Sequence, residues 1–352
     1  MAGLGLPDRG RVDHFFASKG HSPDALERVD FTVSLETGYS SQAHLDSDLK
    51  DVTRAVQVDP ASVAVGYAAP ERIVSTEWLS ANLGHRQLRL LEANEDSLLY
   101  DAGHIPTAAK VDWRSELAGP GTHDVLDPAR LAALMNSKGI GRGHTIVVYG
   151  DKQNRWAAHL LWVLTLFGHT DVRLLDGGRA AWLAEGRETT LDFPRLAQAD
   201  YPLIKRDDET NRVFRDQLAR SLGGSTVLDV RSPEEYAGPR RPIPEYPVER
   251  SARAGHIPSA KNIPWTSAIT PSGHFLPVAE LADAFSALGD GKRSKIVTYC
   301  QIGERSAHTW FVLKFLLGLP NVRHYDGGWS EWGNTITAPI ATGEDPGAAP
   351  GP

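Results

Sequence analysis

The chain repeats itself, and this repeat limits its possible folds more than any other feature. Three blocks of the first half recur in the same order in the second half: 100–113 with 252–265, 144–168 with 294–318, and 171–182 with 321–332. Self-similarity at this scale indicates a duplicated structural unit. The length of the chain also indicates more than one domain, because 352 residues exceed what one average hydrophobic core accommodates.

We therefore predict two similar domains, at 73–190 and 213–343, joined by a linker over 191–212. The segment 1–70 is polar and has no sustained hydrophobic period, so we expect a poorly ordered extension. The end of the chain, 344–352, is expected to be a disordered tail.

Each half alternates short β-rich runs with helical patterns. The second half has apolar runs typical of buried strands at 225–230, 295–300 and 322–326, and helical patterns that end at glycine at 277–289 and 305–318. This alternation predicts an α/β fold in which each domain is a parallel sheet with helices on both faces. In such sheets, sites form at the carboxyl ends of the strands.

Composition excludes several classes of function. A net charge of −7 disfavours a nucleic-acid binder, and a single cysteine excludes an internal disulfide or a cysteine-cluster metal site. The most apolar run, 157–168, is shorter than the roughly 20 residues of a membrane span, and the N-terminus has no apolar signal region. We expect a cytoplasmic monomer.

The single cysteine, Cys300, follows a predicted strand and precedes a predicted helix. Between them Gly303 permits a sharp turn, so that backbone N–H groups and the helix dipole would form an anion cradle. Such a cradle is expected to lower the pKa of the thiol below the ordinary value of about 8.5. Arg305 would add a forked donor for an oxyanion. The alternative is a small core residue near a turn.

The first repeat lacks the thiol. Gly150 stands at the position of Cys300, whereas Tyr149 and Arg155 match Tyr299 and Arg305. We interpret the two loops as the same turn, with a reactive thiol in the second copy only.

Together, the Cys300 loop, the "GHIP" blocks and the block "VRHYDGGWSEW" resemble the tandem-domain rhodaneses, a family of sulfurtransferases. The resemblance covers about 73–343, with Thr107 and Ser259 replacing a usual glycine. It implies an inactive first domain and a catalytic Cys300 that takes sulfur from thiosulfate as a persulfide and passes it to cyanide, a thiol or a thioredoxin-like protein. It also implies that no metal or organic cofactor is needed, because the covalent intermediate holds the sulfur. The loop residues implied to bind the persulfide and substrate are Gln301, Ile302, Gly303, Glu304, Arg305 and Ser306.

The donor stays open. The loop is closest to the Cys-Arg-Ile-Gly-Glu-Arg-Ser type of bacterial thiosulfate sulfurtransferases, but Gln301 removes one positive charge and Glu304 adds a negative one. The compound 3-mercaptopyruvate is the alternative donor. Two other functions remain: a cysteine phosphatase or arsenate reductase, which would need a loop one residue longer, and a non-enzymatic binding module.

Further residues have weaker support. Asp229 and Arg231 resemble family positions that brace the active loop, although a structural ion pair fits equally well. In animal relatives a substrate-binding arginine stands where this chain has Glu235.

An arginine-rich insertion at 239–253 offers Arg240 and Arg241 as donor ligands. Arg155 and Trp156 are candidates for the wall of the pocket. His104 and His256 occur in both repeats, so we expect structural hydrogen bonds from them.

Overall fold

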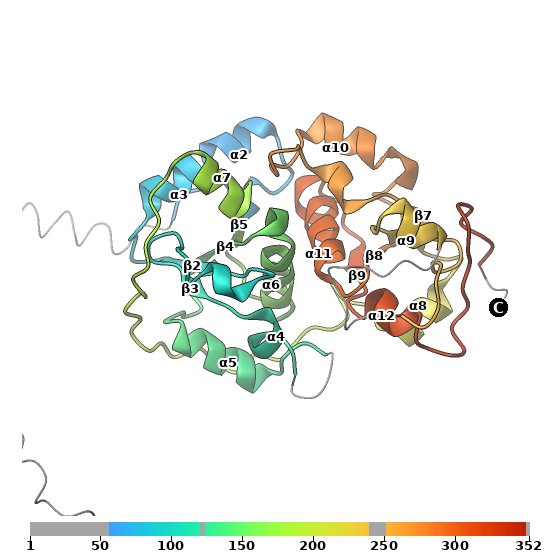
Figure 1. Cartoon of the computed structure of the whole chain (residues 1–352), viewed down its shortest axis with the longest axis horizontal. Helices are drawn as coiled ribbons and strands as arrows, with labels where there is room; N and C mark the ends of the chain where they lie inside the picture. Colours follow the sequence, from blue (N-terminus) through green and yellow to red (C-terminus); the bar gives the residue numbers. More distant parts are fainter. Residues whose placement is uncertain (1–55, 120–123, 239–250, 350–352) are drawn as a thin grey trace, which may run out of the picture. The chain divides into compact units, whose positions relative to one another are not determined.

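The computed structural model describes residues 56–119, 124–238 and 251–349. It contains two parallel sheets, one in each predicted domain, and this confirms the α/β fold (Figure 1). The strands of the first sheet lie in the order β1-β5-β4-β2-β3: β1 (Ile73–Val74), β2 (Leu88–Glu92), β3 (Ala109–Lys110), β4 (Thr145–Tyr149) and β5 (Val172–Leu175). The second sheet has the order β7-β6-β8-β9: β6 (Thr226–Asp229), β7 (Lys261–Asn262), β8 (Ile296–Tyr299) and β9 (Val322–His324).

The two sheets repeat one topology, since β2, β3, β4 and β5 correspond to β6, β7, β8 and β9. An isolated parallel bridge between Arg212 and His324 takes the place that β1 has in the first sheet. Both central strands, β4 and β8, are buried along their whole length, as the apolar runs predict.

Helices cover the sheets. Those of the first domain are α2 (Pro60–Val65), α3 (Thr76–Asn82), α4 (Trp113–Glu116), α5 (Pro128–Ser137), α6 (Arg155–Leu166) and α7 (Gly178–Ala184). Those of the second are α8 (Arg215–Ser221), α9 (Pro233–Ala237), α10 (Val278–Ala284), α11 (Glu304–Phe311), which continues as a π-helical turn (Val312–Leu316), and α12 (Gly328–Trp332). Short 3-10 turns lie at Pro70–Arg72, Ser97–Leu99, Lys152–Asn154, Trp265–Ala268 and Ser286–Leu288. None of the helices in the described ranges is long and apolar enough to cross a membrane.

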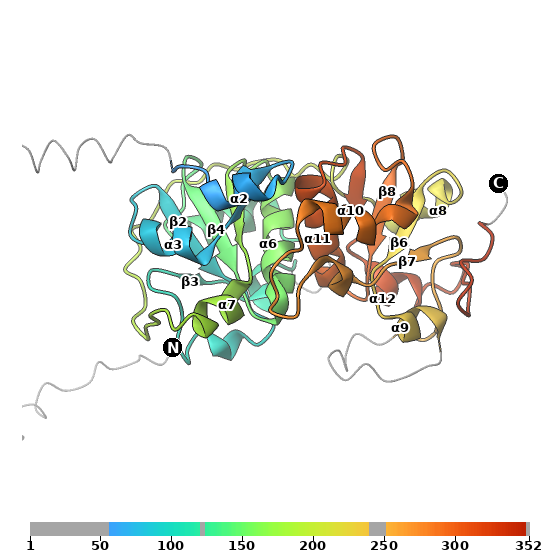
Figure 2. The same cartoon turned by 90° about the horizontal axis from the view of Figure 1, so that it is seen from above.

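The helices that follow the two central strands pack against each other: α6 of the first domain lies along α11 of the second (Figures 1 and 2). One hydrophobic cluster accordingly includes buried residues of both, among them Leu160 and Trp310. Helix α11 therefore packs against both domains.

The ordered fold begins earlier than the sequence suggests. Within the segment expected to be a disordered extension, α2 is capped by Asp59, whose side chain accepts a hydrogen bond from the Ala61 N–H. Arg173 donates to the backbone carbonyls of Val56 and Gln57. The expectation therefore fails for 56–70, because buried partners fix a segment whose own sequence has no period.

The repeated "GHIP" blocks have a structural role. His104 and His256 stack on Tyr100 and Tyr236, with ring centroids 3.8 and 3.7 Å apart, and each Nδ1 hydrogen-bonds to the carbonyl of that tyrosine. The structural hydrogen bonds predicted for these histidines are confirmed.

Candidate active site

Cys300 directly follows β8, and α11 begins four residues later at Glu304. The turn depends on Gly303, whose φ of 108° lies in the left-handed region. A Cβ added there would lie 3.0 Å from the carbonyl oxygen of Asp326. The short loop therefore folds the first turn of α11 back over the sulfur.

Three neighbours contact the Cys300 Sγ atom. The Gly303 N–H donates to it at 3.1 Å and the Ser306 hydroxyl at 3.4 Å, while the thiol lies 3.5 Å from Oε2 of Glu304. The first two contacts resemble the predicted cradle. The third places a carboxylate where only donors were expected.

The pKa of Cys300 is raised, contrary to the expected lowering. Burial is the main cause, because Cys300 has no exposed surface and an apolar surrounding disfavours the thiolate. The carboxylate of Glu304 raises the pKa further, while Arg305 and the donors from Ser306 lower it. Burial therefore outweighs the lowering of the Cys300 pKa that was expected from the helix dipole and Arg305.

Arg305 is occupied by acidic partners. Its two terminal nitrogens donate to both carboxylate oxygens of Glu235, at 2.8 and 3.0 Å, and its Nε lies 3.2 Å from Oε1 of Glu304. The guanidinium of Arg305, which was expected to bind an oxyanion, is thus already paired with protein carboxylates. Glu235, noted above as a departure from the animal family pattern, is the partner.

Gln301 and Ile302 point to different surroundings. The Gln301 amide is buried and donates to the Ser251 hydroxyl at 3.2 Å. Ile302 lines a cavity of about 880 Å³, together with Trp156 from the first domain. The predicted wall position of Trp156 agrees with this cavity, where it stacks on Trp113 at 3.6 Å.

The cysteine loop is held in place by the "DGGW" motif at 326–329, which lies in the repeated block 321–332. The Trp329 and Ser330 N–H groups donate to the carbonyls of Cys300 and Gln301, at 2.8 and 2.9 Å. A Cβ on Gly328 would lie 2.6 Å from the Gln301 carbonyl oxygen. The "DGGW" sequence thus allows the backbone to approach the loop closely.

Asp229 and Arg231 form a buried ion pair of 2.6 Å. Arg231 also donates to the Gly255 carbonyl, and Asp229 accepts from the Tyr299 hydroxyl at 2.5 Å. Within the described residues, the pair braces the strand end before Cys300 rather than the loop at 301–306.

Three other candidate positions differ from expectation or cannot be placed. Arg155 is buried and pairs with Glu95 at 2.5 Å, with its guanidinium over the ring of Trp265. Arg240 and Arg241 lie outside the described residues. Arg253, at the end of the same insertion, donates to the carbonyls of Ala338 and Gly333.

Sequence reasoning missed His324 in β9. Its Nε2 lies 2.8 Å from the Ser306 hydroxyl, which connects it to the sulfur. It also missed Arg212, which pairs with Asp326 next to the loop, and with Asp124 and Asp208. The one available signal was the position of His324 two residues before the repeated Asp326.

The corresponding loop of the first domain has a different backbone conformation. Lys152, Gln153 and Asn154 all have positive φ, at 46°, 55° and 66°, whereas the second loop turns at Gly303. A Cβ on Gly150 would lie 2.1 Å from the Ala93 carbonyl oxygen. The interpretation of one turn with and without a thiol was therefore wrong.

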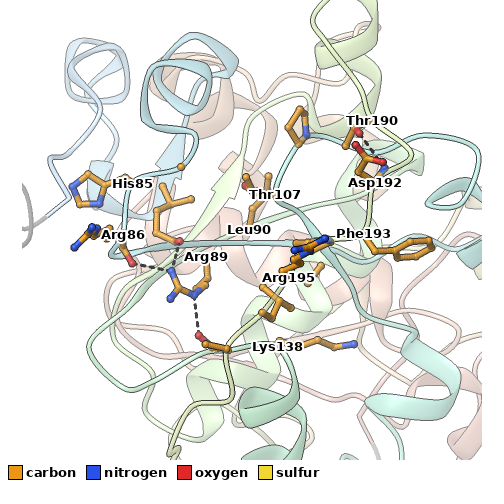
Figure 3. Close-up of a pocket in the computed structure, with 18 of the residues that line it drawn as sticks. His85, Arg86, Arg89, Leu90, Thr107, Lys138, Thr190, Asp192, Phe193 and Arg195 are labelled. Atoms are coloured by element: carbon orange, nitrogen blue, oxygen red, sulfur yellow. Dashed lines mark hydrogen bonds between the residues drawn. The ribbon is translucent and has the colours of Figure 1, made fainter. Parts of the chain in front are cut away.

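A second cavity, of about 750 Å³, lies in the first domain and has no residue of the cysteine loop in its lining (Figure 3). Arg89 is fixed there by the carbonyls of Gly139, Arg86 and Leu88. Nowhere in the described parts of the chain do three or more His, Cys, Asp or Glu side chains form a group suited to a metal ion.

Comparison with known proteins agrees with this geometry. The model of the rhodanese-like domain matches twice, at residues 75–185 and 214–335. The thiosulfate sulfurtransferase of Corynebacterium glutamicum is 50% identical over 298 residues, covering 83% of this chain and 97% of that protein. The sulfur carrier protein TtuD of Thermus thermophilus is 46% identical over 286 residues, covering 80% and 100%.

A solved structure has a similar fold. The anaerobic ergothioneine biosynthesis enzyme from Chlorobium limicola, in complex with its natural substrate trimethyl histidine, superposes with a TM-score of 0.68 at 25% identity. The match covers 78% of this chain and 71% of that enzyme.

Proposed function

The chain belongs to the rhodanese family, and from this premise we propose that it is a thiosulfate sulfurtransferase acting through a persulfide on Cys300. The observation that carries the proposal is the position of the only cysteine, at the carboxyl end of β8 with the Gly303 N–H and the Ser306 hydroxyl on its sulfur.

The proposed reaction has two halves. The Cys300 thiol first loses its proton, and the thiolate attacks the outer sulfur of thiosulfate. A new S–S bond forms on Cys300, while the S–S bond of thiosulfate breaks and sulfite leaves with the electron pair. In the second half cyanide or a thiol attacks the outer sulfur of the persulfide, and the Cys300 thiolate is the leaving group.

The chain's own residues support both halves. Donors from Gly303 and Ser306 stabilise negative charge on the sulfur, as an oxyanion hole does. Donor and acceptor would enter through the cavity lined by Ile302 and Trp156. A small sulfur donor and a thiophilic acceptor are the proposed partners, with a thioredoxin-like protein as one form of the acceptor. The cytoplasmic location and monomeric state stay predictions.

The test compares the wild-type chain with Cys300→Ser. Thiosulfate should add one sulfur to the wild-type protein by mass spectrometry, and cyanide should then release thiocyanate. The variant should do neither. Thiocyanate turnover by the variant would refute the mechanism, and Cys300-dependent hydrolysis of p-nitrophenyl phosphate would favour the phosphatase alternative.

A further inference from the structure

The carboxylate of Glu304 is placed to interact with any charge that develops on the Cys300 sulfur. Its Oε2 lies 3.5 Å from Sγ, and its side chain has no exposed surface. Its other oxygen, Oε1, lies 3.2 Å from Nε of Arg305. As the first residue of α11, Glu304 is held by the helix that both domains pack against.

Within the described parts of the chain, the arginines beside the cysteine loop are paired with carboxylates. Arg305 faces Glu235 as well as Glu304, so this cluster of one cation and two anions has a net charge of −1 before the thiol ionises. Arg231 pairs with Asp229. Arg212 pairs with three carboxylates, those of Asp124, Asp208 and Asp326.

The histidines that face this cluster do not add positive charge near neutral pH. His159 of α6 interacts electrostatically with Glu304, and burial lowers its pKa to about 4. His324 of β9 reaches the sulfur through Ser306, and burial lowers its pKa well below the ordinary value. A donor therefore meets a negative sulfur beside a negative carboxylate.

We propose that Glu304 selects the sulfur donor by charge, disfavouring the thiosulfate dianion relative to donors that carry a single negative charge. The inference rests on the proposed function and concerns its first half-reaction. Because Coulomb repulsion scales with the charge of the donor, the carboxylate opposes a dianion about twice as strongly as a monoanion at the same distance. Glu304 is then a specificity-determining residue for the reaction at Cys300.

The monoanionic probe is 3-mercaptopyruvate, whose only charge at neutral pH is its carboxylate. The Cys300 thiolate attacks its sulfur, an S–S bond forms, and the C–S bond breaks. The electron pair goes to carbon, which takes up the donor's thiol proton, and pyruvate leaves. Both donors thus yield the same persulfide and differ in charge at attack.

The experiment measures the second-order rate constant of persulfide formation with each donor, in the wild type and in Glu304→Gln. Glutamine keeps the size and one acceptor oxygen but removes the charge. The ratio of the thiosulfate constant to the mercaptopyruvate constant should rise about fivefold, as expected for one extra unit of charge close to a carboxylate in a partly hydrated site. A change in the pKa of Cys300 acts on both donors and cancels in this ratio. An unchanged or smaller ratio would overturn the proposal.

Glu235→Gln is the matched control, because Glu235 also pairs with Arg305, whereas the carboxylate at the sulfur is that of Glu304. The ratio of the two rate constants should change less than half as much in Glu235→Gln as in Glu304→Gln. An equal change in both variants would mean that freeing Arg305, rather than removing the charge at the sulfur, sets the preference, and would overturn the role of Glu304.

If Glu304→Gln does not fold, Glu304→Asp gives a second measurement, because it keeps the charge but shortens the side chain and moves the carboxylate away from the sulfur. The ratio of the thiosulfate constant to the mercaptopyruvate constant should then rise by less than about fivefold, since Coulomb repulsion falls with distance. An unchanged or smaller ratio in Glu304→Asp would contradict the proposal. Failure of the sulfur-transfer function itself would look different, since neither donor would then load Cys300.

Discussion

At the scale of single residues, burial and the Glu304 carboxylate raise the pKa of the Cys300 thiol. Its reactivity toward a small alkylating agent should therefore rise with pH. It should level off at a higher pH than the reactivity of free cysteine does, since only the thiolate reacts. Iodoacetamide labelling followed by mass spectrometry over a pH series measures this.

This labelling experiment has a clean control. The chain has one cysteine, so Cys300→Ser should incorporate no label on sulfur. If the reactivity of Cys300 levels off at a lower pH than that of free cysteine, the hydrogen-bond donors at the sulfur outweigh burial, as expected from the sequence.

The sequence identifies the candidate nucleophile but not the electrostatics around it. Cys300, Gly303 and Arg305 are readable because a strand end, a glycine and a short spacing to arginine occur together. The pairing of Arg305 with Glu235 joins residues 70 positions apart, and no local pattern encodes it. The contact of Glu304 with the sulfur arises from the backbone angle of Gly303, which sets where the first helical turn lies.

At the scale of elements, α11 is buried on nearly every side, and His308 shows the consequence. Its ring stacks on Phe275 at 4.9 Å and meets Trp265 edge-on at 5.2 Å. Burial, with a smaller contribution from Arg155, lowers its pKa to about 3. The folded chain thus holds His308 neutral at pH values where the unfolded chain protonates it.

The sign of the pH effect follows. Between about pH 6.5 and pH 3 the unfolded state binds a proton at His308 that the folded state does not, so His308 makes stability fall as pH falls. The slope for this group approaches about 1.4 kcal/mol per pH unit. Urea unfolding of the wild type and His308→Phe at pH 8 and pH 5 measures it. The variant should lose less stability between the two pH values, whatever its stability at pH 8, and an equal loss would contradict the assignment.

Helices and strands were predicted well where hydrophobic periodicity is strong. The strand patterns at 225–230 and 295–300 contain β6 and β8, and the helical pattern at 305–318 covers all of α11 except its first residue, Glu304. The loop of the first domain was predicted wrongly, because its backbone is set by Asn154. This side chain accepts from the Gly150 N–H and donates to the Leu175 carbonyl.

At the scale of the whole molecule, a short segment before the first strand reaches the second domain. The Ala68 and Ala69 N–H groups donate to the carbonyls of Leu316 and Phe315, and Tyr67 donates to the Leu276 carbonyl. Arg72 lies over the ring of Phe315 at 4.7 Å. The boundary at residue 73 predicted from sequence would cut this segment off.

A truncation series tests this contact. A chain that begins at residue 73 should be less stable than one that begins at residue 56 by about 3 kcal/mol or more, at about 1 kcal/mol for each lost hydrogen bond. A chain that begins at residue 66 keeps the bonds to the second domain but lacks α2, so its stability should fall between the two. Urea unfolding followed by tryptophan fluorescence measures all three, and equal stabilities would show that the segment contributes nothing.

The crowded position at Gly150 bears on the evolutionary history of the duplication. With the Ala93 carbonyl 2.1 Å from any added Cβ, a single codon change to cysteine there would meet the backbone before it could supply a nucleophile. A Gly150→Cys substitution alone therefore cannot give the first repeat a nucleophile, because the loop around it would have to be rebuilt first.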